Sequence, residues 1–311
     1  MGAIKTGPSM LDTLLSEGFA YHATESARLA GELEAAADEA RGRPDSWVQF
    51  LRFSTHTIGE HLSDWPRARR LAERVLAGQA PTPVTAKAWA HLSTARLMSG
   101  DGAGAAAAEG TFLAAAGGDF RGSLLEARFM LAAALVGSGR PDDGAAVYGS
   151  ALTLAEGLGE AAPARAIAVA SNNLASDLLE RADRSADESA LMRRAAEAAH
   201  VYWLKCGDWT NDERALYLKA MVANVLGDPN TALAHADRAL AIIAENGGEP
   251  VDETFLKLTR AHALSLLGEG AESDRALAQA DSQAAAWDDE SLRNWYAAER
   301  LRVMGEAASV A

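Results

Sequence analysis

The chain has 311 residues, of which 49% are hydrophobic, and its formal net charge is −14 at pH 7. This length allows one long solenoid or two compact domains, and the acidic balance without a long Lys/Arg cluster argues against nucleic-acid binding. Cys206 is the only cysteine, which excludes an intramolecular disulfide and a paired-cysteine metal site. No signal peptide and no apolar run long enough for a membrane span is visible, so we expect a cytoplasmic protein without membrane contact.

Helical periodicity dominates the chain, and no strand alternation is found. The segment from Met10 to Arg41 predicts a short helix, a break near Gly18 and a longer Ala/Glu-rich helix. Turns rich in Gly, Pro and Asp separate the helices that follow. These helices are predicted at residues 47–61, 67–77, 85–99, 103–116, 124–137, 144–157, 164–181, 189–205, 212–226, 229–243, 253–267, 272–286 and 292–304.

The stretch from Gly227 to Ile243 shows the repeating unit most clearly. Asp228 and Pro229 supply a capping side chain and a preset helical φ at the start of a helix. Ala232, Ala236 and Ala239 then fall on one face, where small side chains allow a second helix to approach closely. A helix, a tight turn and a second helix with small contact residues form one unit of a helical repeat.

Small residues near the start of each second helix recur along the chain, with a period near 40 residues. They are Ala68, Ala105, Gly144, Ala232 and Ser273. The long interval between Gly144 and Ala232 leaves room for one further unit, for which both Ala190 and Ala195 are possible anchors. The register of this fifth repeat is open.

Several segments resemble the tetratricopeptide repeat. Trp89-x2-Leu92 matches the start of its signature, with Ser93 in the Gly position and Arg96 in the Tyr position. Gly144-x3-Tyr148-x2-Ala151 and Ala232-x3-Ala236-x2-Ala239 match its second helix, and Asn173-Leu174-Ala175 resembles an Asn-Leu-Gly version. No unit carries the whole signature, and the repeats are longer than those of the family.

This resemblance implies an all-α, right-handed α-solenoid of about seven antiparallel helix pairs with a C-terminal capping helix. The expected organisation is a flexible N-terminus at residues 1–9, a repeat domain at 10–286, a capping helix at 287–305 and a tail at 306–311. A cap needs one apolar side, which Leu292, Trp295, Tyr296 and Val303 provide.

No catalytic, cofactor or metal site is predicted. Gly100 to Ala105 fits G-x-G-x-x-A, but a helix precedes it where a dinucleotide site needs a strand. His56 and Glu60 have the i, i+4 spacing of a helical zinc site, but His61 lies one step further around the helix and no third histidine is near in sequence. Cys206 has no histidine base that the sequence places beside it.

First helices line the concave face in superhelices of this family, so projecting the repeat register predicts a partner-binding groove. Its aromatic rings supply contact area and its amides can bond a peptide backbone. The predicted binding residues are Phe50, Phe53, Lys87, His91, Phe129, Asn172, Asn173, Arg214, Tyr217, Asn224 and His262.

These features favour a non-enzymatic module that binds a protein or peptide, as a scaffold, chaperone or regulatory partner. The acidic balance fits a basic or otherwise polar partner, and the oligomeric state is open. The alternative is an enzyme or a small-molecule or peptide sensor with a pocket enclosed by the superhelix. A continuous open channel would favour the first function, and a closed pocket with a buried histidine or carboxylate would favour the second.

Overall fold

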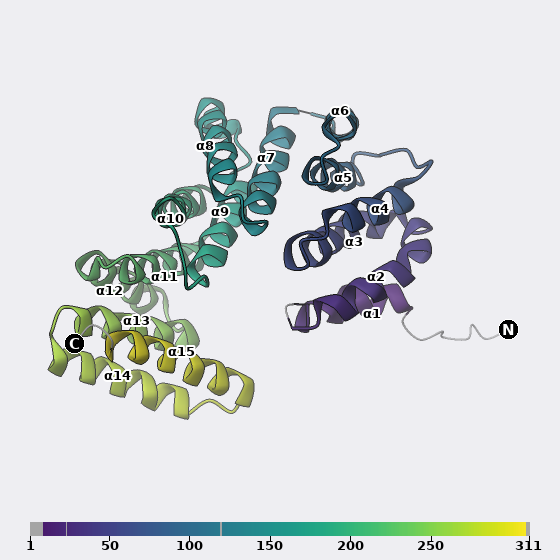
Figure 1. The fold of residues 1–311 in the computed structure, drawn as a ribbon. Helices are drawn as coiled ribbons and strands as arrows, with labels where there is room; N and C mark the ends of the chain where they lie inside the picture. Colours follow the sequence, from purple (N-terminus) through teal and green to yellow (C-terminus); the bar gives the residue numbers. More distant parts are fainter. Residues whose placement is uncertain (1–8, 23, 119, 309–311) are drawn as a thin grey trace. The chain divides into compact units, whose positions relative to one another are not determined.

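The structure, a computed structural model, describes residues 9–308 apart from residues 23 and 119. The flexible N-terminus expected at residues 1–9 lies outside this part of the chain except for Ser9, as do the last three residues of the expected tail. All regular secondary structure in the described residues is helical (Figure 1). In this described part, consecutive helices pack as seven pairs, α1/α2 to α13/α14, followed by a last helix α15. The prediction of an all-α fold of stacked helix pairs is therefore confirmed.

Contacts between residues divide the chain into two compact units, residues 1–162 and 163–311, which we describe separately. Unit 1 begins with two helix pairs and the short segments between them, and ends with two longer pairs. Its elements are α1 (Met10–Glu17), η1 (Gly18–Ala20), α2 (Ser26–Arg41), η2 (Pro44–Ser46), α3 (Trp47–Ser54), η3 (Thr55–His61), α4 (Trp65–Leu76), α5 (Lys87–Met98), α6 (Gly102–Ala116), α7 (Phe120–Gly137), α8 (Pro141–Leu158) and η4 (Gly159–Ala161).

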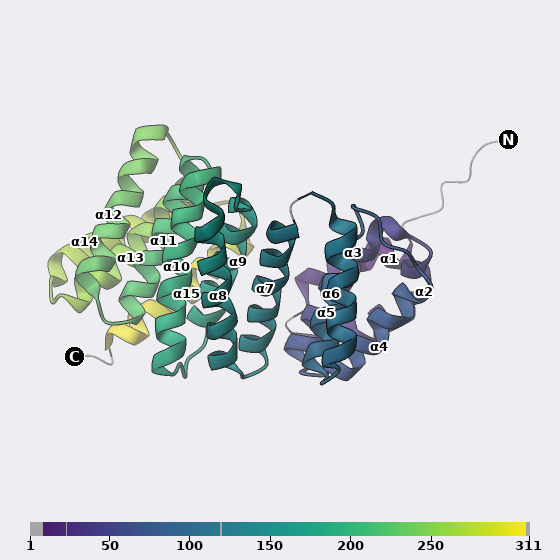
Figure 2. The same ribbon diagram turned by 90° about the horizontal axis from the view of Figure 1, so that it is seen from above.

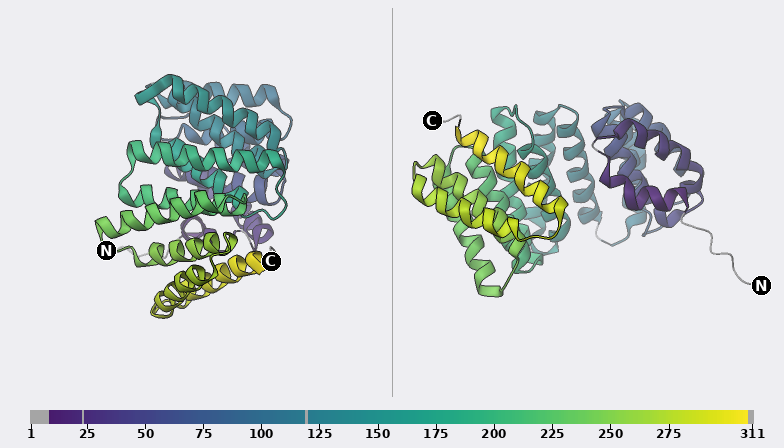
Figure 3. Two further views of the ribbon diagram at one scale, coloured as in Figure 1. Left: turned by 90° about the vertical axis from the view of Figure 1, so that its left-hand side faces the viewer. Right: turned by 90° about the horizontal axis from the view of Figure 1, so that it is seen from below.

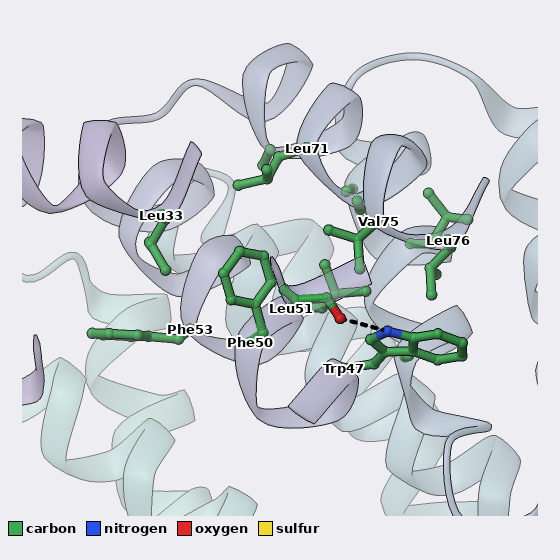
Figure 4. Packing of buried hydrophobic residues seen from close by; sticks show 14 of the residues in the cluster. Leu33, Trp47, Phe50, Leu51, Phe53, Leu71, Val75 and Leu76 are labelled. Carbon is green, nitrogen blue, oxygen red and sulfur yellow. Dashed lines mark hydrogen bonds between the residues drawn. The ribbon is translucent and has the colours of Figure 1, made fainter. Parts of the chain in front are cut away.

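The core of unit 1 is built around α3 (Figure 4). Phe50 and Leu51 are fully buried in one cluster with Val75 of α4. The indole N–H of Trp47 donates to the carbonyl of Ala40 at 2.9 Å, which ties α3 to the end of α2. Burial of a large apolar side chain contributes about 1.5–3 kcal/mol, so this cluster holds the first two pairs together.

Unit 2 consists of three pairs and a last helix. Its elements are α9 (Ala164–Leu179), α10 (Ala186–Cys206), α11 (Trp209–Val225), α12 (Pro229–Asn246), α13 (Pro250–Leu266), α14 (Gly270–Ala285) and α15 (Glu290–Ala308). The first helices α9, α11 and α13 contact one another in that order and form one layer. The second helices α10 and α12 each pack between successive first helices, and α14 packs against α13. The antiparallel course of such a pair is visible for α7 and α8 of unit 1 in Figure 2.

Helix α15, drawn in yellow in Figure 3, packs against α13 and α14. Tyr296 and Val303 are buried there and Leu292 is half-buried, whereas Trp295 is 58% exposed. The expected apolar side of a capping helix is thus largely present, with one tryptophan partly outside it.

The small residues that mark the repeat lie at equivalent places in the helices. Each stands three positions after the first residue of its second helix and is buried: Ala68, Ala105, Gly144, Ala232 and Ser273. Added side-chain volume does not fit there, since a Cβ at Gly144 would clash with the side chain of Val136. The close approach also allows the hydroxyl of Ser273 to donate to the carbonyl of Ala261 on the paired helix, at 2.8 Å.

Residues 47–61, expected as one α-helix, form two kinds of helix. The α-helix α3 ends at Ser54, and η3 continues as a π-helix to His61. The break expected near Gly18 is present, because α1 ends at Glu17. Of the helices in the described residues, none has an apolar stretch long enough to cross a bilayer.

Candidate functional site

Three histidines of unit 1 converge on one point. One ring nitrogen each of His22, His56 and His61 lies within 4.8 Å of the other two, and the Nε2 atoms of His56 and His61 are 3.1 Å apart. His22 lies in the turn between η1 and α2, and the other two histidines lie on η3. Residues from two helix pairs therefore form one cluster, in which His22 and His56 are half-buried and His61 is exposed.

The partners of the rings define which nitrogen carries the proton. His22 Nδ1 is 2.7 Å from the carbonyl oxygen of Phe19, and His56 Nδ1 is 2.6 Å from a carboxylate oxygen of Glu60. Carbonyl and ionised carboxylate oxygens only accept hydrogen bonds, so both Nδ1 atoms are donors. In the neutral rings the lone pair is then on Nε2, and the Nε2 of His56 accepts from the Nε2–H of His61.

The π-helix explains why His56 and His61 meet. In an α-helix, residues five positions apart point in clearly different directions, but the i→i+5 hydrogen bond of a π-helix widens the turn and brings them to the same side. The N–H of Leu62 makes such a bond to the carbonyl of Thr57, at 3.2 Å. With α-helical geometry, as expected from sequence, His61 would point away from His56, so the α-helical expectation for this segment is wrong at η3.

One serine and one threonine hydroxyl lie where the α-helix α3 changes to the π-helix η3. Ser54 and Thr55 donate to the carbonyls of Phe50 and Leu51, at 2.8 and 2.9 Å. Such bonds to the preceding turn often bend a helix. Gly59 then allows η3 to lie directly on an indole, since a Cβ there would be 2.6 Å from the ring of Trp65.

Aromatic packing places the turn that carries His22. The ring of Phe19 stacks on Phe53 with centroids 4.6 Å apart, and it also lies 5.1 Å from the ring of His22. Gly18 permits this approach, because a Cβ there would clash with Phe53. Partial desolvation beside the neighbouring rings, followed by the positive forms of His56 and His22, lowers the pKa of His61 below its usual value.

The predicted binding residues of unit 1 lie mostly inside its core. Phe50 and Phe53 are buried, and Phe129 packs edge-on against Tyr148 with centroids 5.4 Å apart. His91 is buried and hydrogen-bonds Thr55 at 3.2 Å, and burial lowers its pKa to about 3, so the ring is neutral. Lys87 is exposed and forms an ion pair with Glu126 at 2.6 Å.

The predicted residues of unit 2 are on the first helices α9, α11 and α13. Asn173 is exposed and Asn172 half-buried on α9, and Arg214 is exposed on α11, where it pairs with Asp252 at 2.8 Å. Asn224 is buried, and its side-chain N–H donates to the carbonyl of Thr259 at 3.0 Å, which links α11 to α13. Asn224 thus has a packing role in addition to any binding role.

The face of α13 is covered by a helix of the same chain. Phe255 of α13 lies 4.5 Å from Trp295 and 5.8 Å from Tyr296 of α15, between ring centroids. Tyr217 of α11 is half-buried in the same cluster. Its pKa is raised, first by burial and then by the negative charge of Glu299 on α15. His262 of α13 is also buried.

A buried acid lies near the start of α11. Glu213 has no exposed side-chain surface, and its carboxylate oxygens accept no hydrogen bond in the described part of the chain. Burial, followed by the charge of Asp252, raises the pKa of Glu213 to about 8. The adjacent guanidinium of Arg214, at 3.5 Å, opposes this rise without cancelling it.

Comparisons with known proteins give a fold likeness only. No family model and no curated protein sequence matches the chain. Among solved structures, BtubC (BKLC) from P. vanneervenii is similar with a TM-score of 0.47 and 18% identity, over 81% of this chain and 92% of that one. The apo form of the quorum sensor NprR from B. thuringiensis has a TM-score of 0.33 and 12% identity, over 87% and 86%. From its own helix pairs, the chain is an all-α helical-repeat protein.

Proposed function

We propose that the protein is a non-enzymatic binding module that takes a peptide or helix of a partner protein on the first-helix layer of unit 2. The observation that carries this proposal is the packing of α15 on α13. The face of α13 binds this helix of the same chain through contacts of Phe255 with Trp295 and Tyr296. An aromatic face that receives an amphipathic helix is one of the recurring modes of peptide recognition.

The partner's place is the part of this layer that α9 and α11 form. There Asn172 and Asn173 are at least partly accessible, unlike Asn224, whose amide is engaged with Thr259. Amide side chains can bond the backbone of an extended peptide. The net charge of −14 favours a basic or otherwise polar partner.

Site-directed photocrosslinking in the native host tests this proposal. A photoreactive amino acid at Asn173 of α9 is expected to capture a partner polypeptide. The matched control carries the same amino acid at Arg275, which is 70% exposed on the second helix α14. Equal capture at both positions, or none at Asn173, would contradict binding on the first-helix layer.

A further inference from the structure

We propose that His22, His56 and His61 form a binding site for a divalent transition-metal ion of the Zn²⁺ type. Imidazole nitrogen is a preferred ligand of Zn²⁺, Cu²⁺ and Ni²⁺. Three histidines with one open position are also an established zinc coordination set in proteins. This site is independent of the partner surface proposed on unit 2.

The spacing of the donor atoms suits a tetrahedral ion. Nitrogens that each bind Zn²⁺ at about 2.0–2.1 Å lie about 3.3 Å apart at the corners of a tetrahedron. The Nε2 atoms of His56 and His61 are already 3.1 Å apart. All three donor atoms lie within 4.8 Å of one another, so small side-chain rotations complete the set.

The rings of His22 and His56 are held in the tautomer that a metal ion needs. A metal-binding histidine almost always donates its other N–H to a carboxylate or a carbonyl, which fixes the ring and makes the ligand nitrogen more basic. Glu60 supplies this carboxylate for His56 at 2.6 Å, and the Phe19 carbonyl supplies the acceptor for His22 at 2.7 Å. Glu60 is therefore a positioning residue rather than a ligand.

An ion would replace the proton that now lies between two rings. His61 donates its Nε2–H to His56 in the metal-free arrangement, so both Nε2 atoms face the same point. On binding, His61 carries its proton on Nδ1 instead and stays neutral, and the charge of the complex is that of the added ion. The exposure of His61 leaves the fourth position to water or to a donor group from outside.

A metal ion at this site would link two helix pairs of unit 1. His22 follows η1 in the first helix pair, whereas His56 and His61 belong to the second pair. A bound ion would therefore cross-link two pairs of unit 1. Because the unfolded chain does not hold the three rings together, binding stabilises the folded state by mass action.

The test is a Zn²⁺ titration by calorimetry, on the full chain without a histidine tag and with Cys206→Ser to remove the exposed thiol. One Zn²⁺ per chain is expected to bind, and to raise the melting temperature of unit 1. His22→Ala and His61→Ala should each weaken binding by about 100-fold or more, and Glu60→Gln by about 10–100-fold. The control His235→Ala, of a half-buried histidine on α12, should leave binding unchanged.

Co²⁺ provides a second measurement that needs no substitution in the histidine cluster. In the Cys206→Ser chain, the intense visible absorption of tetrahedral Co²⁺ is expected at one equivalent and should disappear when Zn²⁺ is added. Failure to bind one equivalent of either ion would overturn the proposal. The proposal would also be overturned if His235→Ala and His61→Ala lost Zn²⁺ binding equally while both metal-free variants melted at the same temperature.

Discussion

Replacing Glu213 by glutamine should stabilise the protein near neutral pH and leave its stability almost unchanged in acid. Glu213 is buried, its carboxylate oxygens accept no hydrogen bond within the described residues, and its pKa is raised from 4.5 to about 8 in the folded state. Between these two values the unfolded chain has lost the proton while the folded chain retains it. The folded state then binds more protons, so stability falls as the pH rises from about 4.5 to about 8.

The size of the effect follows from 1.36 kcal/mol per pKa unit. Relative to its value in strong acid, the free energy of unfolding of the wild type should be lower by roughly 1 kcal/mol at pH 5. At pH 8 it should be lower by at most roughly 4 kcal/mol. Glutamine has nearly the shape of the protonated acid and does not ionise. The stability difference between Glu213→Gln and the wild type should therefore grow by at most roughly 3 kcal/mol between these two pH values.

Urea unfolding followed by far-ultraviolet circular dichroism at about pH 5 and pH 8 measures this difference. Glu245→Gln is the matched control, because Glu245 is 63% exposed on α12 and should show no such growth. An equal advantage of Glu213→Gln at both pH values would contradict this prediction, since Glu213 would then be ionised in the folded protein at neutral pH.

Three further predictions concern the stability or the binding affinity of substituted variants. Phe50→Ala should lower the free energy of unfolding by about 3–5 kcal/mol in urea titrations, since Phe50 is fully buried. Gly59→Ala should lower the free energy of unfolding by about 1–3 kcal/mol in urea titrations, because the added Cβ would press on Trp65. It should also weaken Zn²⁺ binding in the calorimetric titration, because η3 would be displaced. Asn172→Ala with Asn173→Ala should weaken partner binding by about 1–3 kcal/mol with an unchanged thermal melt; a collapsed melt would place these amides in the core.

The helix pairs of this protein can be predicted from sequence because their signals are local. Asp64, Asp101 and Asp228 each accept a hydrogen bond from the backbone N–H three residues later, and each stands directly before a second helix. Buried small residues such as Ala68 and Ala232 follow at a constant offset. Caps and small contact residues act within one or two turns, so their effect can be read without knowing the rest of the fold.

The side of the helix on which each predicted groove residue lies cannot be read from local signals. The repeat register places Phe50 and Phe129 on first helices, but it does not say which side of each helix meets the neighbouring pair. The rings are in the core of unit 1, and part of the corresponding layer in unit 2 is covered by α15. Only the packing of several helices at once decides which side chains remain accessible.

The histidine cluster depends on tertiary structure to an even greater extent. Sequence alone shows His56, Glu60 and His61 on one segment, and α-helical geometry separates the two histidines. Packing of Gly59 on Trp65 accompanies the π-helical winding that brings them together, and the stacking of Phe19 on Phe53 brings His22 to them from another helix pair. Local signals thus determined the helices, whereas contacts between residues distant in sequence decided which side chains meet, because such contacts form only when the pairs are stacked.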